Sequence, residues 1–316
     1  MEGKNRILGT GSSAVQVIEA AARDAAEVKI FQKEPNWLLP KEARDFSPLE
    51  RELHKFAPVY WWKRFKLYFD YNNRQFRAQH ARSGFKVHQD RAAKSKAFLE
   101  KSLADRPDLL KLATPDFPIE ARRTVISDTY YDTIKNPKVT LLPQGAKDLT
   151  EKGIIDDAGN EHEVDMIVYA TGFDAANYLA GFKVKGINGK DLHETWAGEP
   201  EALLGLMVPN FPNFFMMYGP NTNAIPLVTY YEAQANFCAS LISKAVRKRK
   251  QVIEVKEKPF RRFNDRIQQT LSKTVWASTT NYFQAGTGKI VSQWPFTPTE
   301  YLISLKIARF TAVRMK

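Results

Sequence analysis

The chain has 316 residues, 43% of them hydrophobic, which is enough apolar material for one or two domains with a buried core. Its formal net charge of +12 predicts a basic surface that suits anionic ligands. The single cysteine, Cys238, excludes an internal disulfide and favours a reducing compartment, and no apolar run reaches the ~20 residues of a membrane span. The residues after Met1 do not have the pattern of a signal peptide, so we expect a cytoplasmic protein without a transmembrane segment.

The first motif combines a glycine turn with a strand on each side and one helix. Residues 6–8 form a short apolar run, and the sequence Gly-Thr-Gly-Ser-Ser-Ala follows at 9–14. Small apolar residues then repeat at helical spacing, and residues 28–31 predict a second strand. A glycine turn occurs in many α/β proteins, but this strand–turn–helix–strand order within about thirty residues favours a dinucleotide-binding fingerprint.

Each small residue of this turn has an expected role. Gly9 permits the tight turn, and Gly11 lets backbone N–H groups approach a diphosphate at the helix N-terminus, where the helix dipole favours negative charge. Ala14 occupies the place of a third glycine, where a small side chain is needed for close packing of the helix on the strand.

The end of the second strand bears on the choice between NAD and NADP. An acidic residue there selects the free ribose hydroxyl of NAD, and a basic residue selects the phosphate of NADP. Lys33 argues for the phosphate and Glu34 argues against it. A pair of solvated opposite charges is an equally good interpretation.

Residues 41–112 are charged, aromatic and helical in their periodicity. Interleaved aromatic and basic residues, as in the stretch 60–69, can mark a nucleic-acid or membrane surface. We favour an amphipathic helical insertion that packs its rings on the domain. No cysteine or second histidine lies at ligand spacing from any histidine here, so we expect no metal site; the histidines are His54, His80 and His88.

The rest of the chain continues the α/β pattern. A proline-bearing loop ends in Arg122-Arg123, and a strand of buried type at 164–169 runs into Ala170-Thr171-Gly172. This second junction again places small residues where a backbone must approach something closely. Further expected elements are a strand at 138–142, a hairpin at 153–163, a strand followed by a loop at 209–223 and a helix at 231–250 whose apolar face holds Phe237, Leu241 and Ala245.

Four motifs in this order resemble the class B flavin-dependent monooxygenases, and within them the Baeyer–Villiger branch. The resemblance extends nearly end to end, as far as the Trp-Pro pair at 294–295. The motifs are GTGSSAVQ at 9–16, FQK at 31–33, ATGFD at 170–174, and FPN at 211–213 with GPNTN at 219–223.

The resemblance implies an α/β fold with two dinucleotide domains, the NADPH domain being inserted into the FAD domain. Residues 1–164 then correspond to the NADPH-binding domain with a helical insertion at about 41–112, and residues 165–316 to the C-terminal part of the FAD-binding domain. The family's first FAD-binding glycine motif would precede Met1. We therefore expect these residues alone to bind little flavin.

The resemblance also implies a chemistry. In the family, NADPH reduces FAD, and a flavin C4a-peroxide formed with O2 inserts one oxygen atom into a ketone or adds it to a heteroatom. Arg123 matches the catalytic arginine and Arg122 matches a basic residue that reaches the NADP phosphate, although adjacent loop arginines are otherwise more often solvated surface. The implied cofactor-binding residues are Gly9, Thr10, Gly11, Ser12, Ser13, Ala14, Gln16, Lys33, Arg122, Ala170, Thr171 and Gly172.

Two other classes of function compete with this interpretation. One is a truncated, flavin-free nucleotide-binding protein or a non-catalytic interaction protein. The other is a nucleic-acid-binding protein that uses the basic charge. The sequence holds no recognised nucleic-acid motif, so we expect a small-molecule substrate and O2 as partners and no nucleic acid.

Overall fold

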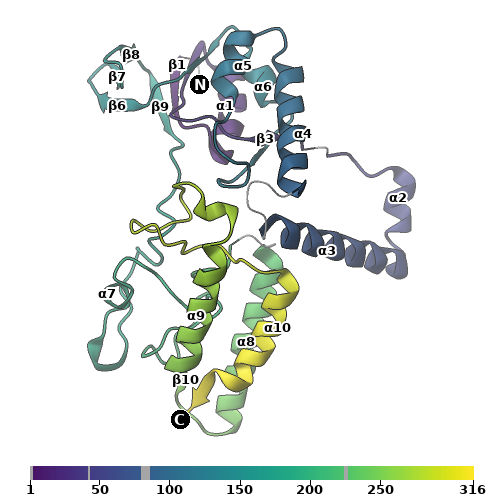
Figure 1. Ribbon diagram of the computed structural model, residues 1–316, viewed down its shortest axis with the longest axis vertical. Coiled ribbons are helices and arrows are strands. Elements are labelled where there is room, and N and C mark those ends of the chain that lie inside the picture. Colours follow the sequence, from purple (N-terminus) through teal and green to yellow (C-terminus); the bar gives the residue numbers. More distant parts are fainter. Residues whose placement is uncertain (1–2, 42, 80–85, 224–226) are drawn as a thin grey trace. The chain divides into compact units, whose positions relative to one another are not determined.

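The computed structural model groups the chain into two compact units (Figure 1). The residues that it describes are 3–41, 43–79, 86–223 and 227–316. The first unit holds Met1–Asp45 and Lys86–Phe173, and the second holds Phe46–Phe85 and Asp174–Lys316. These units differ from a division at residue 164 in two ways: part of the insertion groups with the second unit, and the first unit extends to Phe173. The assignment of NADPH and FAD to separate domains stays a prediction.

The first unit is built on a four-stranded sheet in which all neighbouring strands are parallel. Its order is β5-β2-β1-β9, and Ile7 at the centre lies between Ile30 and Val168. A parallel sheet of this kind confirms the expected α/β class. The strands are β1 (Lys4–Leu8), β2 (Glu27–Phe31), β5 (Val139–Leu142) and β9 (Met166–Tyr169).

Helix α1 (Ser12–Asp24) covers this sheet with the small apolar residues that its spacing predicted. Ala14 and Ile18 are fully buried, and Ala21 is nearly so. Small side chains let the helix approach the strands closely, and three further helices of the unit complete the core. They are α4 (Lys86–Ser102), α5 (Pro107–Ala113) and α6 (Tyr130–Ile134).

Two small sheets complete the first unit. The predicted hairpin is confirmed, and its turn is held by Asp156, whose carboxylate accepts hydrogen bonds from the N–H groups of Ala158 and Asn160, both at 2.9 Å. Its strands β7 (Gly153–Asp156) and β8 (Glu161–Glu163) join β6 (Ala146–Leu149) in one antiparallel sheet, and β3 (Leu38–Leu39) pairs with β4 (Val125–Ile126) in another.

The burial expected for the strand at 164–169 is wrong, although the strand itself is confirmed. The side chains of Met166 and Tyr169 in β9 are exposed. The reason is topological: in the described part of the chain, β9 pairs with β1 on one side only and so forms an edge of the sheet.

The second unit is mainly helical. The helix predicted at 231–250 is confirmed as α8 (Leu227–Arg247), and Phe237, Leu241 and Ala245 on its apolar face are buried. The other elements are α2 (Pro48–Leu53), α3 (Ala57–Gln79), α7 (Leu192–Trp196), α9 (Glu257–Leu271), α10 (Pro298–Thr311), the 3-10 turns Ile187–Gly189 and Val275–Ala277, and the antiparallel pair β10 (Ile253–Val255) and β11 (Val313–Met315).

No strand forms at 209–218, so that prediction is wrong. Asn210, Asn213 and Tyr218 have φ values of 71°, 58° and 57°. This left-handed conformation turns the chain repeatedly, and a strand cannot contain it. The apolar residues that suggested a strand instead bury Phe211 and Met216 in a small core with Trp196.

The expectation that the rings of the insertion pack on a domain is also wrong. Trp61, Trp62, Phe65 and Phe69 of α3 are all more than half exposed. Tyr68 and Asn72 on the same helix do attach it to α10, through hydrogen bonds to Thr299. Helical spacing predicted the helix correctly, but it does not determine whether a partner covers the apolar side.

Two general features complete the fold. No group of three metal-ligating side chains occurs within the described residues, which include His54 and His88, whereas His80 lies outside them. Of the helices that the structure describes, none is long and apolar enough to cross a bilayer.

Candidate nucleotide-binding site

The turn between β1 and α1 requires a glycine at its first position. Gly9 has a φ of +108°, and its N–H donates a hydrogen bond to the carbonyl of Phe31 at 3.0 Å. A Cβ on Gly9 would lie 2.5 Å from the carbonyl oxygen of Ala170, well inside the contact distance. The N–H of Ala170 in turn donates to the carbonyl of Leu8 at 3.0 Å. The end of β9 therefore packs directly on the turn, which only glycine allows.

The second glycine faces open space at the start of the helix. No atom lies within 4 Å of the position that a Cβ on Gly11 would occupy. Gly11 is the N-cap of α1, no side chain caps it, and the first turn carries no acidic residue. The N–H groups of this turn are therefore available, with the positive end of the helix dipole, to an anion such as a diphosphate.

The remaining residues of the motif divide into packing and surface positions. Ala14 is fully buried beneath the helix, as its role in helix–strand packing predicts. Ser12 is half-buried, whereas Ser13 and Gln16 are exposed.

Thr10 connects the turn to the segment after β2. Its hydroxyl donates to the carbonyl of Glu34 at 3.1 Å, and the amide of Asn36 donates to its carbonyl at 2.9 Å and to its hydroxyl at 3.2 Å. Thr10 itself is buried. Sequence reasoning missed Asn36, although an asparagine directly after a proline is a turn signal that could have identified it.

The two charges after β2 do not pair with each other. The carboxylate of Glu34 forms an ion pair with the guanidinium of Arg122, and Lys33 is exposed and has no ion pair with any described residue. Of the alternatives left open by the sequence, the structure thus excludes a simple Lys33–Glu34 pair. The pairing brings Arg122, a predicted cofactor-binding residue, to the same end of the sheet as the glycine turn.

Arg122 is held by a ring as well as by a carboxylate. Its guanidinium lies 4.5 Å from the centre of the Phe117 ring, and the indole N–H of Trp37 donates to the carbonyl of Phe117 at 2.7 Å. Burial lowers the pKa of Arg122, but an arginine remains cationic at neutral pH. Phe117 was another residue that sequence reasoning missed, because no local pattern links it to Arg122.

Arg123 differs from its neighbour. Its side chain is exposed and forms no ion pair or hydrogen bond with the residues that the structure describes. The catalytic role implied by the resemblance stays a prediction, since the geometry of the first unit shows only that the charge of Arg123 is not already neutralised.

The second junction of small residues joins the first. Ala170 lies against Gly9, while Thr171 and Gly172 are exposed and turn the chain where β9 ends, with a φ of +100° at Gly172. The carboxyl ends of β1 and β9 thus meet at one edge of the parallel sheet, which is where α/β proteins of this kind bind nucleotides.

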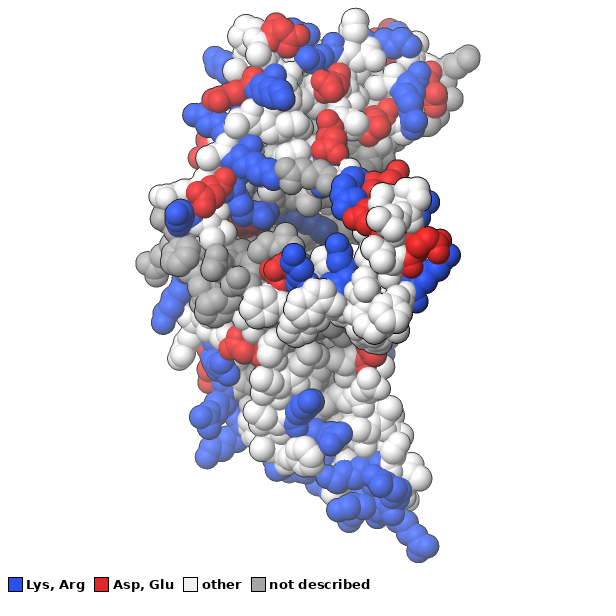
Figure 2. Space-filling view, turned by 90° about the vertical axis from the view of Figure 1, so that its right-hand side faces the viewer, with Lys and Arg blue, Asp and Glu red and all other residues white. Residues whose placement is uncertain are grey.

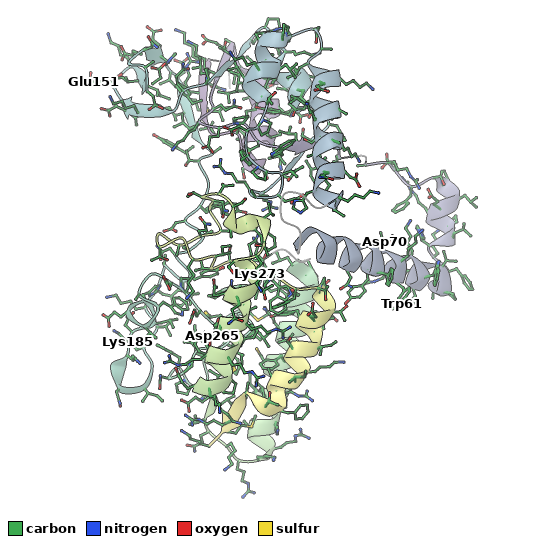
Figure 3. The ribbon with its side chains drawn as sticks, in the orientation of Figure 1. Trp61, Asp70, Glu151, Lys185, Asp265 and Lys273 are labelled. Atoms are coloured by element: carbon green, nitrogen blue, oxygen red, sulfur yellow. The ribbon has the colours of Figure 1, made fainter. Side chains whose placement is uncertain are left out.

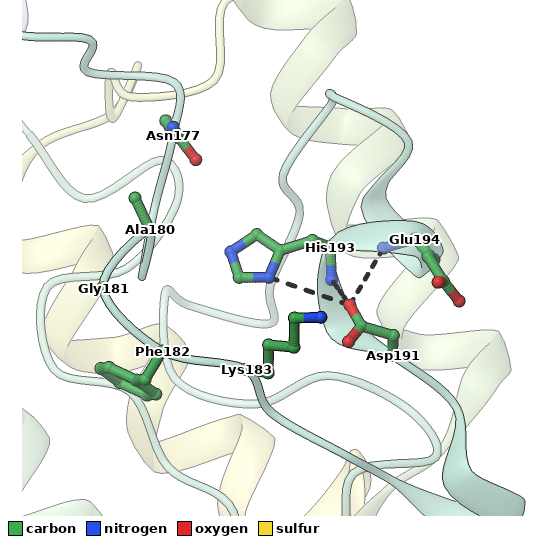
Figure 4. Close-up of a pocket in the computed structure, with 8 residues that line it drawn as sticks. All are labelled: Asn177, Ala180, Gly181, Phe182, Lys183, Asp191, His193 and Glu194. Atoms are coloured by element: carbon green, nitrogen blue, oxygen red, sulfur yellow. Dashed lines mark hydrogen bonds and ion pairs between the residues drawn. The ribbon is translucent and has the colours of Figure 1, made fainter.

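The second unit contains a cavity of about 470 Å³ that the sequence did not indicate (Figure 4). Asp191 accepts hydrogen bonds from the N–H groups of His193 at 2.9 Å and Glu194 at 3.3 Å, and pairs with Lys185 at 3.1 Å. The hydrogen bond from Lys185 is the largest of the interactions that lower the pKa of Asp191. Asp191 caps the short helix α7, and its carboxylate is already paired with Lys185. We therefore assign these residues a structural role.

The parallel sheet with a glycine turn into α1 is a Rossmann-like fold, the class that binds dinucleotides. No protein-family model matches the chain. A FAD-binding monooxygenase of Aspergillus niger is 30% identical to it over 303 residues, which are 93% of this chain and 50% of the relative. A Baeyer-Villiger monooxygenase of Pseudomonas aeruginosa is 30% identical over 302 residues, which are 93% and 56% of the two chains.

Solved structures agree in fold. OTEMO in complex with FAD and NADP superposes with a TM-score of 0.83 at 21% identity, covering 99% of this chain and 66% of that one. Cyclohexanone monooxygenase from Rhodococcus sp. Phi1 bound to NADP+ gives a TM-score of 0.82 at 21% identity, covering 99% and 67%. The chain is thus similar to proteins named FAD-binding and Baeyer-Villiger monooxygenases, which confirms the resemblance carried by its motifs. It spans about half the length of the curated relatives that it matches.

Proposed function

We propose that the first unit binds NADPH at the N-terminus of α1, as part of an FAD- and NADPH-dependent monooxygenase. The reaction inserts one oxygen atom of O2 into a ketone or adds it to a heteroatom. The relatives named as FAD-binding and Baeyer-Villiger monooxygenases support this function, as do neighbours solved with FAD and NADP. The observation that carries the proposal is the open, uncapped backbone at Gly11.

The residues present fit NADPH. The N–H groups of Ser12, Ser13 and Ala14 begin the helix behind Gly11 and would donate to the diphosphate. Lys33 and Arg122 would supply positive charge for the phosphate on the adenosine ribose, with Glu34 competing for Arg122. NADPH supplies a hydride, and the role of these residues is to bind and orient the donor.

The described residues do not provide a complete site for FAD. Among the described helices, only α1 follows a parallel strand through a glycine turn, and that turn is the one assigned to NADPH. A bound flavin would activate the oxygen. We propose no role in that step for the residues of this chain. We expect these 316 residues to bind little flavin by themselves.

Arg123 is the proposed catalytic residue. A guanidinium keeps its charge at any physiological pH and can stabilise an anion that develops near the substrate. Its exposure and its lack of a carboxylate partner among the described residues support this role. We further propose that the protein acts in the cytoplasm, because Cys238 is a free thiol and suits a reducing compartment.

Calorimetric titration with NADPH tests the site. The variant Gly11→Val places a branched side chain where the diphosphate must approach, and we expect affinity to fall by at least about a hundredfold. Gly181→Val is a matched control, because Gly181 also faces open space without a left-handed φ but lies in the second unit. Equal NADPH affinities for wild type and Gly11→Val would contradict the site. In a version of the protein with the family's FAD-binding region restored, binding of NADPH without oxygenation of a ketone would favour the non-catalytic nucleotide-binding alternative.

A further inference from the structure

Helix α3 carries a ridge of stacked rings on its surface. The rings of Trp62 and Phe65 lie 5.9 Å apart at 27°, and those of Phe65 and Phe69 lie 6.4 Å apart at 24°. Their spacing of three and four residues places them on one side of the helix, together with Trp61. We refer to Trp61, Trp62, Phe65 and Phe69 as the ring face. Each of its side chains is between 58% and 67% exposed, so the apolar area is available to a partner.

Lys63, Arg64 and Lys66 lie on the helix that carries the ring face. The guanidinium of Arg64 lies 5.4 Å from the centre of the Trp61 ring, and Lys66 follows Phe65 on the same helix. The ammonium of Lys63 lies 5.9 Å from the centre of the Phe46 ring instead. None of the three forms an ion pair with a described residue.

Asp70 lies on the opposite side of α3 from Trp61 (Figure 3), as expected for residues about two and a half turns apart. The hydrogen bond that Arg64 donates to Tyr60, followed by the charge of Glu232, raises the pKa of Arg64, but Arg64 forms no ion pair with any described carboxylate.

Helix α10 of the same unit also exposes apolar side chains next to cations. Helix α10 exposes Ile303, Ile307 and Phe310, and the charged ends of Lys244 and Arg309 lie 5.7 Å and 4.8 Å from the centre of the Phe310 ring. Figure 2 shows an uncharged area of the second unit that ends in a cluster of Lys and Arg side chains. Exposed apolar side chains bordered by cations thus recur on this unit.

We propose that the ring face of α3 docks on an anionic lipid surface. Aromatic side chains prefer the boundary between water and acyl chains, and lysine and arginine beside them bind the phosphates of anionic lipids. No described helix can cross a bilayer, so α3 would lie in the plane of the headgroups. This proposal does not depend on the nucleotide site.

The same features disfavour two other occupants. A second copy of the chain would bring like cations together across a symmetric contact, which costs free energy. A single-stranded nucleic acid needs open ring faces on which its bases can stack, and here the rings of Trp62, Phe65 and Phe69 stack on one another.

Sedimentation with lipid vesicles tests the proposal. Wild-type protein should bind vesicles of phosphatidylcholine and phosphatidylserine, and bind much less to phosphatidylcholine alone. The triple change Trp62→Ser, Phe65→Ser and Phe69→Ser should weaken binding at least about tenfold, because it removes the buried apolar area. The matched control replaces three exposed apolar residues elsewhere and should bind as wild type: Ile126→Ser, Leu149→Ser and Phe182→Ser.

Charge is tested in the same assay. Replacing Lys63, Arg64 and Lys66 by glutamine should cost about fivefold for each charge removed, with the loss shrinking at high salt. The control removes the same net charge from exposed positions of the first unit, through Lys101→Gln, Lys111→Gln and Lys147→Gln. Lys63 is half-buried and the other changed residues are exposed, so unaltered thermal melting should accompany the loss of binding.

Brominated acyl chains report where the protein inserts. They should quench wild-type tryptophan fluorescence, and quench much less in a variant with Trp61→Phe and Trp62→Phe, which keeps the apolar character. Equal binding by the ring-face variant and its control, or by the charge variant and its control, would overturn the proposal. Dimers or RNA complexes that the ring-face variant abolishes, without vesicle binding by the wild type, would also overturn it and assign the face to that partner.

Discussion

The glycine turn of the first unit and the ring face of the second unit contrast in what covers them. At the turn, Gly9 contacts Ala170, Thr10 bonds to the segment after β2, and Ala14 is fully buried. On α3, the ring of Trp62 stacks on the ring of Phe65 and is 67% exposed to solvent. Local backbone rules determine the turn almost completely. The same local rules form α3 but leave its apolar side without a partner within the described chain.

The largest expected effect is the difference in free energy of unfolding between alanine variants of the buried Trp294 and the exposed Trp62. Trp294 is 1% exposed, donates a hydrogen bond from its indole to the carbonyl of Thr297 at 3.1 Å and packs against Tyr301. We expect Trp294→Ala to lower the free energy of unfolding by about 3–5 kcal/mol, and Trp62→Ala to change it by less than about 0.5 kcal/mol. Urea denaturation measures both. Similar losses for the two variants would mean that α3 is covered after all.

Gly9 and Gly11 provide the same contrast within the turn: Gly9 is packed against Ala170, whereas Gly11 faces open space. Gly9→Val introduces a left-handed branched residue and a clash with Ala170, so we expect a loss of about 2–4 kcal/mol in the free energy of unfolding. Gly11→Val should leave stability nearly unchanged while abolishing NADPH binding, because its side chain enters open space. Denaturation and calorimetry together separate the two effects. A stable Gly9→Val variant would show that the end of β9 moves away at little cost.

Glu34 tests whether the carboxylate that pairs with Arg122 weakens NADPH binding. Glu34→Gln removes the carboxylate that pairs with Arg122 and should tighten NADPH binding by about fivefold, with a smaller change for NADH. The gain should shrink at high salt, because part of it is screened charge. Glu151→Gln, on the turn between β6 and β7, is the control. Equal changes for NADPH and NADH would place Glu34 away from the ribose phosphate.

Asp156 gives a pH-dependent effect in the hairpin. A hydrogen bond from His162 at 2.9 Å is the largest interaction that holds the pKa of Asp156 well below its ordinary value. A lowered carboxyl pKa in the folded state stabilises the fold above the unfolded value of about 4, and this stabilisation is lost as the pH falls below it. Asp156→Asn should therefore melt at a lower temperature than wild type at pH 7, with the difference shrinking in acid. The exposed Asp116→Asn should show little difference at either pH.

Arg123 should have the smallest effect on the fold. Since its side chain has no partner among the described residues, Arg123→Ala should change neither thermal melting nor NADPH affinity. In a version of the protein with the family's FAD-binding region restored, supplied with FAD and a ketone, the same variant should lose product formation. Unchanged oxygenation would place the catalytic charge elsewhere, and a lower melting temperature would identify Arg123 as a structural residue.

Short-range features of the fold followed from the sequence. The spacing of Ala14 and Ile18 predicted α1 and its buried side, and the glycine turn predicted an anion site at the helix start. The partners of these residues did not follow. Contacts such as Glu34 with Arg122 join residues far apart in the chain, and no local pattern encodes them. The predicted roles of the site residues in binding NADP and FAD remain predictions.

The errors have a common physical cause. The apolar run at 164–169 looked buried because parallel strands are usually covered on both faces, but β9 forms an edge. The aromatic run near 214 looked like a strand because its residues have high β-propensity, but asparagines at 210 and 213 adopt left-handed conformations. In both cases the local sequence preference is real, but tertiary contacts determine the final burial or conformation.

The contact between Gly9 and Ala170 has a consequence for the order of folding. The turn at Gly9 closes on Ala170, in a segment that the ribosome makes much later. At the other end of β1, the backbone N–H of Lys4 donates to the carboxylate of Asp165, 161 residues further along the chain. Contacts of such long range form slowly, because a large loop must lose its entropy before they are made. The first strand emerges first and yet acquires its last neighbour only when nearly the whole first unit has been synthesised. A nascent chain that stops before β9 should therefore leave one side of the turn uncovered, so maturation of this site is coupled to completion of the unit.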